Sequence, residues 1–401
     1  FWGVQTLRQL LPVDRGADPT VPAVQIADAP RYPWRGVMLD VARHFYPVSF
    51  VKRQIDLMSY YKFDVFHWHL TDDQGWRIQI NKYPKLTSVG AWRTEADGKS
   101  YGGFYTQAEI REVVAYAKAR NVMVVPEIEM PGHSSAAIAA YPDLSCSGKP
   151  ISVPTTWGVL RNVDCVGKAQ TFHFLENVLD EVTKLFPSQY VHIGGDEVPE
   201  GVWDDCKACA GLAKANGFQD DEQGLHSYFV GRIEKYLASK DKTLVGWDEI
   251  LEGGLSPHAI VEVWRGPDEA KKALANGNRI IIAGPFYMDT PIDRMTLQDL
   301  YRTDPFDNPL YASHPKQVLG GEAPLWSERA TPRNGDARLY PRLLAISEHF
   351  WNQAAQHDWN HFLVRARAQE AWLASQHVAY GPENKDIVDY RLIFNPTYER
   401  W

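Results

Sequence analysis

The 401-residue chain lacks several features that would place it in a specialised class of protein. No apolar run approaches the ~20 residues that a membrane-spanning helix requires, and no secretory signal peptide is visible. Basic runs are also missing and the formal net charge is −8, so nucleic acid is not an expected partner. These absences leave a globular protein in which 44% of the residues are hydrophobic, enough to form a large core.

Cysteine is scarce, with four residues in the chain. Cys146 and Cys165 bracket a loop rich in Ser, Pro, Thr and Gly, which is compatible with a disulfide in an oxidising compartment. Cys206 and Cys209 form a C-x-x-C in a segment of helical character, without a second C-x-x-C or a nearby pair of histidines. We therefore predict no zinc site here and expect two further thiols, free or paired.

Aromatic residues, in contrast, are abundant: the chain contains 14 Trp, 19 Tyr and 16 Phe. A large aromatic core accounts for about half of the tryptophans in our interpretation. The remainder indicate a ligand that stacks on flat aromatic faces, and sugars are the leading candidate.

Short apolar runs alternate with amphipathic segments between about residue 35 and residue 350. Near-continuous apolar runs are typical of strands that are buried on both faces of a parallel sheet. The amphipathic segments predict helices; in one of them, Thr106 and Glu109 have the spacing of a capping box. Eight strands are predicted, at residues 35–41, 63–70, 122–130, 190–197, 243–249, 259–266, 279–286 and 318–326.

Eight alternating strand–helix units predict an α/β protein with a (β/α)8 barrel, the TIM-barrel fold. We place this catalytic barrel at residues 31–380. The crossover at residues 250–258 is too short and Gly-rich for a full helix. Residues 1–30 lie outside the barrel, with a short helix at residues 1–11, and residues 381–401 form a C-terminal tail.

The active site of such a barrel is built at the C-terminal ends of the strands. Carboxylates and aromatic residues dominate these ends, and a sugar pocket would collect both kinds of side chain. The candidates are Asp40, Arg43, His67, His69, Asp72, Asp73, Glu127, Glu129, His133, Asp196, Glu197, Trp247, Asp248, Glu249, Trp264, Arg265, Tyr287, Asp289, Glu322, Trp326 and Glu328.

One Asp-Glu dipeptide stands apart from the others. The chain contains five, which begin at Asp180, Asp196, Asp221, Asp248 and Asp268. The pairs at Asp180 and Asp268 fall in helical patterns, and the pair at Asp221 lies in a polar loop. The pair at Asp248 ends a strand and remains a weaker candidate. The pair at Asp196 follows two glycines at the end of the fourth predicted strand. The C-terminal ends of the strands are where a barrel of this kind has its active site.

The two glycines, Gly194 and Gly195, are expected to thin the strand end so that a ligand can approach the backbone. Where the strand gives way to loop, Asp196 and Glu197 can both face the pocket, although adjacent strand residues point to opposite faces. Two carboxyl groups so close raise the pKa of one of them. We expect this effect to keep Glu197 protonated for general-acid work near neutral pH.

The segment "HWHLTDD" invites a different interpretation. His67 and His69 form an H-x-H at a barrel strand end, which could bind zinc and make the protein a metal-dependent hydrolase. Such a site needs further histidines from later strands, and those ends offer Trp and Tyr instead. We therefore favour no metal, and we expect at least one of the two histidines to be buried and hydrogen-bonded.

Seven motifs occur in an order and spacing that resemble one known family. They are "LDVARHFYP", "FHWHLTDDQGWR", "PEIEMPGH", "VHIGGDE", "GWDEI", "VWR" and "GGEAPLWSE". The resemblance is to the family 20 glycoside hydrolases, the β-N-acetylhexosaminidases, and it spans about residues 31 to 350. The first dozen residues resemble the last helix of the small accessory domain that precedes the barrel in many members, so residues 1–30 are expected to be a remnant of it.

The resemblance implies an exo-acting, retaining glycosidase that removes terminal non-reducing β-linked N-acetylglucosamine or N-acetylgalactosamine. In this family the acetamido oxygen of the substrate attacks the sugar and gives an oxazolinium intermediate. The expected partner is an oligosaccharide or glycoconjugate with a terminal N-acetylhexosamine. No cofactor and no metal are expected, and a secreted, periplasmic or lysosome-like location is expected.

The resemblance also implies roles for individual residues. Glu197 would be the general acid and then the base, Asp196 would orient the acetamido N–H and stabilise positive charge, and Tyr287 would hold the acetamido oxygen. Substrate binding would fall to the pocket walls Trp247, Trp264 and Trp326 and to the hydroxyl-binding residues Arg43, Asp289 and Glu328. Supporting groups near the acid would be Asp72, Glu129 and His133.

The residues alone leave other functions open. Glu322 or Glu249 could be the nucleophile of an ordinary retaining mechanism, and only the resemblance argues against this. A catalytically silent sugar-binding barrel is another alternative. An intact set of Asp196, Glu197 and Tyr287 argues against it, because a pure binder needs no proton donor.

Overall fold

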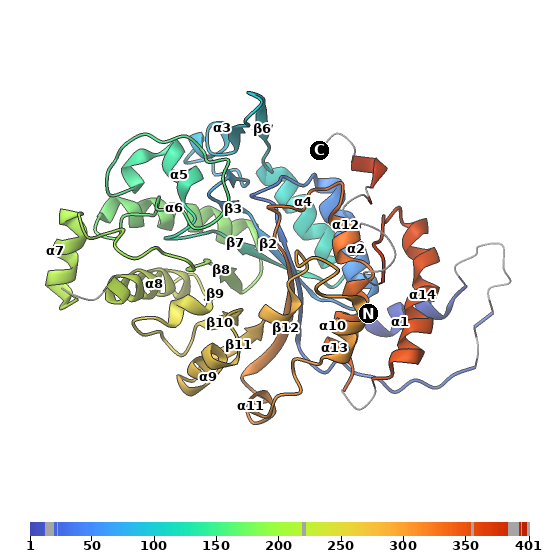
Figure 1. Ribbon diagram of the computed structural model, residues 1–401. Helices are drawn as coiled ribbons and strands as arrows, with labels where there is room; N and C mark the ends of the chain where they lie inside the picture. Colours follow the sequence, from blue (N-terminus) through green and yellow to red (C-terminus); the bar gives the residue numbers. More distant parts are fainter. Residues whose placement is uncertain are drawn as a thin grey trace.

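The computed structural model describes residues 1–12, 20–21, 23–218, 222–353, 357–383, 393 and 395–398. The main strands are β1 (Trp34–Asp40), β2 (Val65–His69), β7 (Met123–Glu127), β8 (Tyr190–His192), β9 (Thr243–Trp247), β10 (Ile260–Val263), β11 (Arg279–Ile282) and β12 (Val318–Leu325). They pair in parallel and close into a barrel in the order β1-β12-β11-β10-β9-β8-β7-β2 (Figure 1). Each strand falls within one of the eight predicted runs or overlaps it, so the predicted (β/α)8 barrel is confirmed.

Helices connect most of the strands around the outside of the barrel (Figure 1). The crossover from β9 to β10 contains only the 3-10 turn η2 (Asp248–Leu251), as its short Gly-rich sequence predicted. Two small hairpins, β3 (Thr71–Asp72) with β4 (Gly75–Trp76) and β5 (Trp92–Thr94) with β6 (Ser100–Gly102), follow β2. The helices are α1 (Trp2–Leu10), α2 (Val48–Tyr60), α3 (Lys85–Ser88), α4 (Gln107–Lys118), α5 (Ser135–Ala140), α6 (Ala169–Leu185), α7 (Lys207–Asn216), α8 (Glu222–Ala238), α9 (Pro267–Ala275), α10 (Leu297–Arg302), α11 (Pro309–Ala312), α12 (Gly335–Leu339), α13 (Arg342–Trp351) and α14 (Trp359–Ser375).

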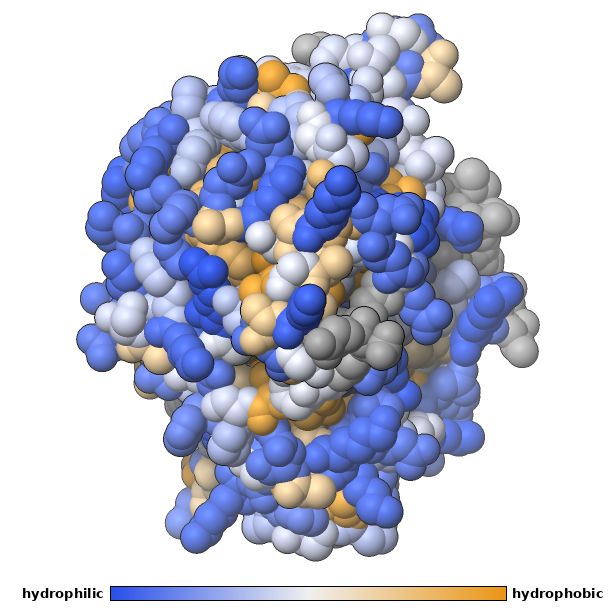
Figure 2. All heavy atoms as spheres, turned by 90° about the vertical axis from the view of Figure 1, so that its left-hand side faces the viewer, coloured by the Kyte–Doolittle hydropathy of each residue, from blue (hydrophilic) through white to orange (hydrophobic). Residues whose placement is uncertain are grey.

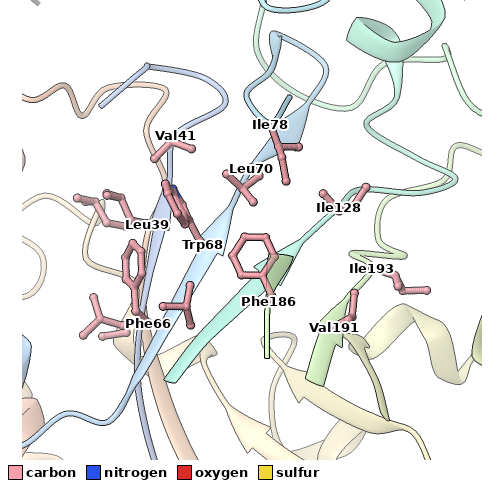
Figure 3. Packing of buried hydrophobic residues seen from close by; sticks show 14 of the residues in the cluster. Leu39, Val41, Phe66, Trp68, Leu70, Ile78, Ile128, Phe186, Val191 and Ile193 are labelled. Atoms are coloured by element: carbon pink, nitrogen blue, oxygen red, sulfur yellow. The ribbon is translucent and has the colours of Figure 1, made fainter. Parts of the chain in front are cut away.

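The strands alternate between the outside and the inside of the barrel. In β2, Phe66 and Trp68 point outward and pack with Leu39, Phe186 and other apolar side chains beneath the helices (Figure 3). His67 and His69 alternate with these two residues and point inward, because successive side chains of a strand face opposite sides. The main hydrophobic core therefore lies between the strands and the helices.

The barrel interior is built in layers. The layer at the N-terminal ends of the strands is apolar and consists of Trp34, Val65, Val125, Val245, Ile260 and Ile281. The next layer is polar and fully buried, and consists of His67, Glu127, His192, Glu262 and Glu322. An aromatic layer closes the C-terminal end, where Met38, Trp247 and Ala283 pack with Trp264, Tyr287 and Trp326. Layered side chains are the usual filling of such a barrel, and here the uppermost layer forms the floor of a site.

Helices α1 and α14 lie on the right-hand side of Figure 1, away from α7. The helix predicted at residues 1–11 is confirmed as α1, whose Gln9 donates a 2.7 Å hydrogen bond to the Tyr60 carbonyl in α2. Trp372 of α14 stacks on the ring of Tyr60 at 3.7 Å between centroids. Much of the stretch before residue 23 and most of the predicted tail at 381–401 lie outside the described residues, so the predicted domain limits stay a prediction.

The surface on the α7 side is mostly hydrophilic, with hydrophobic residues gathered across its middle (Figure 2). Among the helices that the structure describes, none combines the length and the apolar character needed to cross a membrane.

The four cysteines of the chain lie together, which the sequence did not predict. Their sulfur atoms all lie within 4.8 Å of one another, and each cysteine is a free thiol. The disulfide between Cys146 and Cys165, with which the sequence is compatible, is not formed in this structure. The C-x-x-C of Cys206 and Cys209 finds its partners in a loop far back in the sequence, which is why local spacing did not reveal the cluster.

Candidate active site

A cavity of about 210 Å³ opens at the C-terminal end of the barrel. It is small enough for one sugar ring rather than a chain of them. The nine residues predicted to be catalytic or substrate-binding all line it, although they come from six different strand ends or loops: Arg43, Asp196, Glu197, Trp247, Trp264, Tyr287, Asp289, Trp326 and Glu328. The rule that places the site at the strand ends therefore brings these side chains together, as the sequence predicted.

Four aromatic rings line the cavity. The rings of Trp247 and Trp326 lie 5.6 Å apart, and those of Trp264 and Tyr287 stack at 6.4 Å and 26°. Buried carboxylates hold the indoles from behind: Trp247 Nε1 donates to Glu127 at 2.9 Å, and Trp264 Nε1 donates to Glu249 at 3.0 Å. The indole rings are thus fixed in place along the cavity wall, where aromatic faces can stack on a pyranose.

Asp196 and Glu197 lie beyond the end of β8, in an irregular stretch that lets both side chains face the cavity. Glu197 has a φ of +49°, and His133 in the facing loop has a φ of +47°. Non-glycine residues in this left-handed region are uncommon and cluster at functional sites, where the surrounding fold holds them. The backbone therefore supports the prediction that this dipeptide differs from the other four.

The role predicted for Gly194 is wrong. The space beside it is filled by the buried Glu129 carboxylate and not by a ligand, since a Cβ on Gly194 would lie 1.6 Å from Glu129 Oε2. Gly195 is similar, because its Cβ would meet Ile250 at 2.6 Å. The glycines thus let other side chains of the protein pack against this backbone, which places Glu129 next to the backbone that precedes Asp196 and Glu197.

Gly194→Ala is expected to lower the free energy of unfolding by about 1–3 kcal/mol, because the residue has a φ of +67° and no room for a methyl group. Urea unfolding followed by tryptophan fluorescence measures the change. Gly231→Ala in α8 is the matched control: nothing lies within 4 Å of its Cβ, and the helix should gain up to about 1 kcal/mol. Equal stability of the two variants would contradict the packing described here.

His133 connects Asp196 and Glu197 to two carboxylates deeper in the protein. Its Nδ1 lies 3.1 Å from Asp73 and 3.3 Å from Asp72, and its Nε2 lies 3.4 Å from Glu197 and 3.6 Å from Asp196. Burial lowers the pKa of His133, but the Asp72 charge and the hydrogen bonds to Asp72, Asp73 and Glu197 together raise it more, so the pKa lies well above its usual value. His133 is therefore an imidazolium that can donate to the pair, which agrees with its predicted supporting position.

Arg43 is held rigidly at the edge of the cavity. Its guanidinium lies 2.8 Å from Asp72 and 3.5 Å from Asp40, and it sits over the ring of Trp326 at 5.0 Å. These partners leave a fixed fork of N–H donors beside Glu328, an arrangement suited to neighbouring hydroxyl groups.

The protonation of Asp196 and Glu197 differs from the prediction. Burial raises the pKa of Asp196 to about 6, whereas a hydrogen bond from His133 lowers the pKa of Glu197. The proton thus favours Asp196 in the substrate-free protein, and the expectation that Glu197 holds it is wrong for this state. The cause is the His133 imidazolium, which the dipeptide sequence did not indicate.

The predicted alternative of a metal site at His67 and His69 is not favoured. Both histidines are buried, and neither lines the cavity. His69 uses both ring nitrogens on carboxylates, Glu127 and Asp72, while His67 contacts Glu322 at 2.5 Å and Glu127 at 3.0 Å. The expectation that at least one of them is a buried, hydrogen-bonded histidine holds for both.

Sequence reasoning missed His192 and Glu262, which complete the polar layer under the aromatic floor. His192 Nδ1 lies 2.9 Å from Glu127, and His192 Nε2 lies 3.6 Å from Glu262. The sequence did contain a signal for these two residues, because each is an ionisable residue at an inward-facing position of an otherwise apolar strand. Glu127 links this layer to the site, because it accepts the hydrogen bond of Trp247.

The other Asp-Glu pairs have structural surroundings. Asp180 lies in α6 and Asp268 in α9, as predicted, and Asp221 lies outside the described residues. The competing pair, Asp248 and Glu249, forms structural hydrogen bonds. Asp248 accepts from Arg265 and from the Trp264 amide, and Glu249 accepts from the Trp264 indole. Neither of these two carboxylates lines the cavity.

Residues 32–354 match the catalytic domain of glycosyl hydrolase family 20. The chain belongs to this family. It is 45% identical over 387 residues to a β-hexosaminidase of Porphyromonas gingivalis, covering 91% of this chain and 50% of that relative. Identity to a β-hexosaminidase of Akkermansia muciniphila is 38% over 386 residues, covering 90% and 77%.

The fold comparison agrees with the sequence comparison. The crystal structure of a family 20 exo-β-N-acetylglucosaminidase from Vibrio harveyi, in complex with N-acetylglucosamine, matches with a TM-score of 0.86 and 34% identity. The match covers 96% of this chain and 64% of that one. The chain thus spans about half the length of the Porphyromonas gingivalis relative, and the resemblance seen in the seven motifs is confirmed at the level of the family.

Proposed function

We propose that this protein is an exo-acting, retaining β-N-acetylhexosaminidase that removes terminal β-linked N-acetylglucosamine or N-acetylgalactosamine. The observation that carries the proposal is the cavity that Trp247, Trp264 and Trp326 line together with Asp196, Glu197 and Tyr287. A cavity for one sugar fits removal of the terminal residue from a glycan. The relatives named β-hexosaminidase and the Vibrio harveyi complex with N-acetylglucosamine support the same substrate class.

Asp196 and Tyr287 are suited to hold the acetamido group of the substrate. Asp196 Oδ1 is buried and has no hydrogen-bond partner among the described residues, so it can accept from an acetamido N–H. Burial keeps the pKa of Tyr287 well above its usual value, so the phenol stays protonated and can donate to the acetamido oxygen. Together they direct this oxygen at the anomeric carbon, and ionised Asp196 stabilises the cationic oxazolinium that forms.

Glu197 moves the protons of the reaction. It protonates the leaving oxygen as the C1–O bond breaks, then takes a proton from the water that opens the oxazolinium and restores the acetamido group. The pair enters the reaction with one proton, which favours Asp196 in the free protein. Positive charge that develops at the acetamido group favours ionised Asp196, and the proton then belongs on Glu197.

The positions of the remaining carboxylates favour the substrate's own nucleophile over a protein nucleophile. Glu322 lies inside the barrel, bonded to His67 and to the Trp34 indole at 2.9 Å, and is fully buried. Glu249 is bonded to the Trp264 indole and does not line the cavity. Neither alternative nucleophile therefore reaches the space where the anomeric carbon would lie.

A thiazoline mimic of the oxazolinium tests this mechanism. It should inhibit competitively and bind at least about 10²-fold more tightly than the N-acetylhexosamine product, because transition-state and intermediate analogues use the full complementarity of the site. Mass spectrometry of the protein quenched during turnover should find no glycosyl adduct. A covalent glycosyl-enzyme, or a thiazoline that binds no better than product, would contradict the proposal.

The pH profile of kcat/KM should have an alkaline limb that is set by the single proton of the pair. In the free protein this proton lies on Asp196, whose pKa burial raises to about 6, so it is lost as the pH rises through this value and is no longer available to Glu197. Activity should therefore decline above pH 6, towards about tenfold per pH unit. A disaccharide with a terminal β-linked N-acetylglucosamine, assayed across the neutral and alkaline range, measures the limb, and a profile that stays flat well above pH 6 would contradict the assignment.

A further inference from the structure

The four cysteines come from two separate elements that the fold brings together. Cys146 and Cys165 lie next to an isolated antiparallel bridge between Ser145 and Asp164, in the long loop that follows β7. Cys206 and Cys209 lie at the start of α7, in the loop that follows β8, as its N-cap residue and in its first turn. Two of the thiols are buried and two are partly buried.

The distances between the sulfur atoms match a tetrahedron around one metal ion. Cys146 to Cys209, Cys165 to Cys206 and Cys165 to Cys209 are each 3.6 Å, and all four sulfurs lie within 4.8 Å. Zn–S bonds of 2.3 Å give a tetrahedral S···S edge of about 3.8 Å. A disulfide, in contrast, requires about 2.05 Å.

The surrounding backbone holds the four thiols in place. The Cys165 amide donates to the Leu144 carbonyl at 2.7 Å, which fixes the two loop cysteines side by side. Gly167 packs against the first turn of α7 so closely that a Cβ would lie 2.3 Å from Cys209 N. The two halves of the cluster are therefore fitted to each other and do not meet by a loose contact of surface loops.

We propose that these four cysteines form a structural zinc site. Binding converts four thiols to thiolates, so the ion displaces four protons and the Zn(Cys)4 unit carries two negative charges. Lys168 lies beside the loop cysteines, where its ammonium donates to the Ser145 and Asp143 carbonyls at 2.5 and 3.0 Å and supplies a nearby positive charge. Four protein ligands leave no open position, so the ion has a structural and not a catalytic role.

The zinc site joins two of the loops that build the active site. The residue before Cys165, Asp164, donates from its amide to the Pro131 carbonyl at 2.9 Å and accepts from the Trp203 indole at 3.0 Å. Pro131 lies two residues before His133, and Trp203 lies in the loop that follows Glu197. The ion thus fastens the loop carrying His133 to the loop carrying the catalytic pair, at a distance from the reacting atoms.

Oxidation to disulfides is the competing fate of this cluster. Two disulfides, Cys146 with Cys209 and Cys165 with Cys206, would account for two of the three 3.6 Å contacts but not for the third, between Cys165 and Cys209. A central metal ion brings all four sulfurs to similar distances and accounts for all three contacts. The shared spacing is therefore better explained by a common central ligand.

Metal analysis of the purified protein tests the proposal directly, without reference to activity. We expect about one zinc ion per chain and, after denaturation in chelator without reductant, four thiols that react with an alkylating reagent. Replacement by Co²⁺ should give the visible bands of a tetrahedral site together with sulfur-to-cobalt charge transfer. Absence of bound zinc, iron in its place, or recovery of the cysteines as two disulfides would overturn the assignment.

Two variants locate the ion. Cys209→Ser should lose the zinc and the charge-transfer band, whereas the control His357→Ala should keep both. His357 belongs to a separate group with Asp304 and His349 that could also hold an ion. Zinc retained in Cys209→Ser, or lost only in His357→Ala, would refute the site. If Cys209→Ser does not fold, the cobalt spectrum and the thiol count of the wild-type protein still decide.

Discussion

Glu197→Gln should lower kcat/KM by about 10²–10⁴-fold on N-acetylhexosaminides with poor leaving groups, such as a second sugar. The glutamine keeps the size of the side chain but cannot donate the proton that a sugar oxygen needs as it departs. Aryl leaving groups with a low pKa need little protonation, so the same variant should lose much less activity on them. The contrast between the two substrate classes is the signature of a general acid.

The measurement is a comparison of kcat/KM on a disaccharide and on a series of aryl β-N-acetylglucosaminides of decreasing leaving-group pKa. Glu200→Gln is the matched control, because Glu200 is an exposed glutamate of the same loop that does not line the cavity. It should leave both rates close to wild type. Equal loss on both substrate classes in Glu197→Gln would count against its role as the acid.

Asp196→Asn should lower kcat/KM by about 10²–10³-fold on every N-acetylhexosaminide, including those with activated leaving groups. The amide preserves the shape of the side chain but removes the negative charge beside the developing oxazolinium. That charge develops whatever group departs, so a better leaving group does not restore the rate. The limb of the pH profile near pH 6 should disappear in the same variant, because the asparagine no longer holds the proton of the pair.

The two variants distinguish the two carboxyl groups of the pair. Steady-state rates on the same aryl series provide the test, with the pH profile of Asp196→Asn as a second readout. Rescue of Asp196→Asn by activated leaving groups would mean that Asp196 donates the proton. An unchanged limb near pH 6 in this variant would mean that another group titrates there.

The barrel and a set of strand-end candidates were predictable because both follow from short-range patterns, and the family resemblance then selected the cavity residues from these candidates. Buried parallel strands give continuous apolar runs, and their alternation places Phe66 and Trp68 outside and His67 and His69 inside. A closed parallel barrel then brings all C-terminal strand ends to one rim. Residues as distant in sequence as Arg43 and Glu328 could therefore be assigned to one pocket before any contact was known.

Properties that depend on contacts between distant side chains were not predictable in this way. The close approach of Glu129 to Gly194 is a tertiary contact that leaves no periodic signal in either segment. The proton of the catalytic pair is placed by His133, whose loop lies more than sixty residues earlier in the chain. The cysteine cluster is a third case, because its two halves belong to different loops whose packing no spacing rule describes.

The central claim is that the substrate's acetamido group is the nucleophile. The most direct test compares kcat/KM on aryl β-glycosides of N-acetylglucosamine, N-acetylgalactosamine and glucose that carry the same leaving group. We expect turnover of one or both N-acetylhexosaminides and a rate on the glucoside at least about 10³-fold lower, because the glucoside lacks the internal nucleophile. Comparable rates on the glucoside would contradict the account.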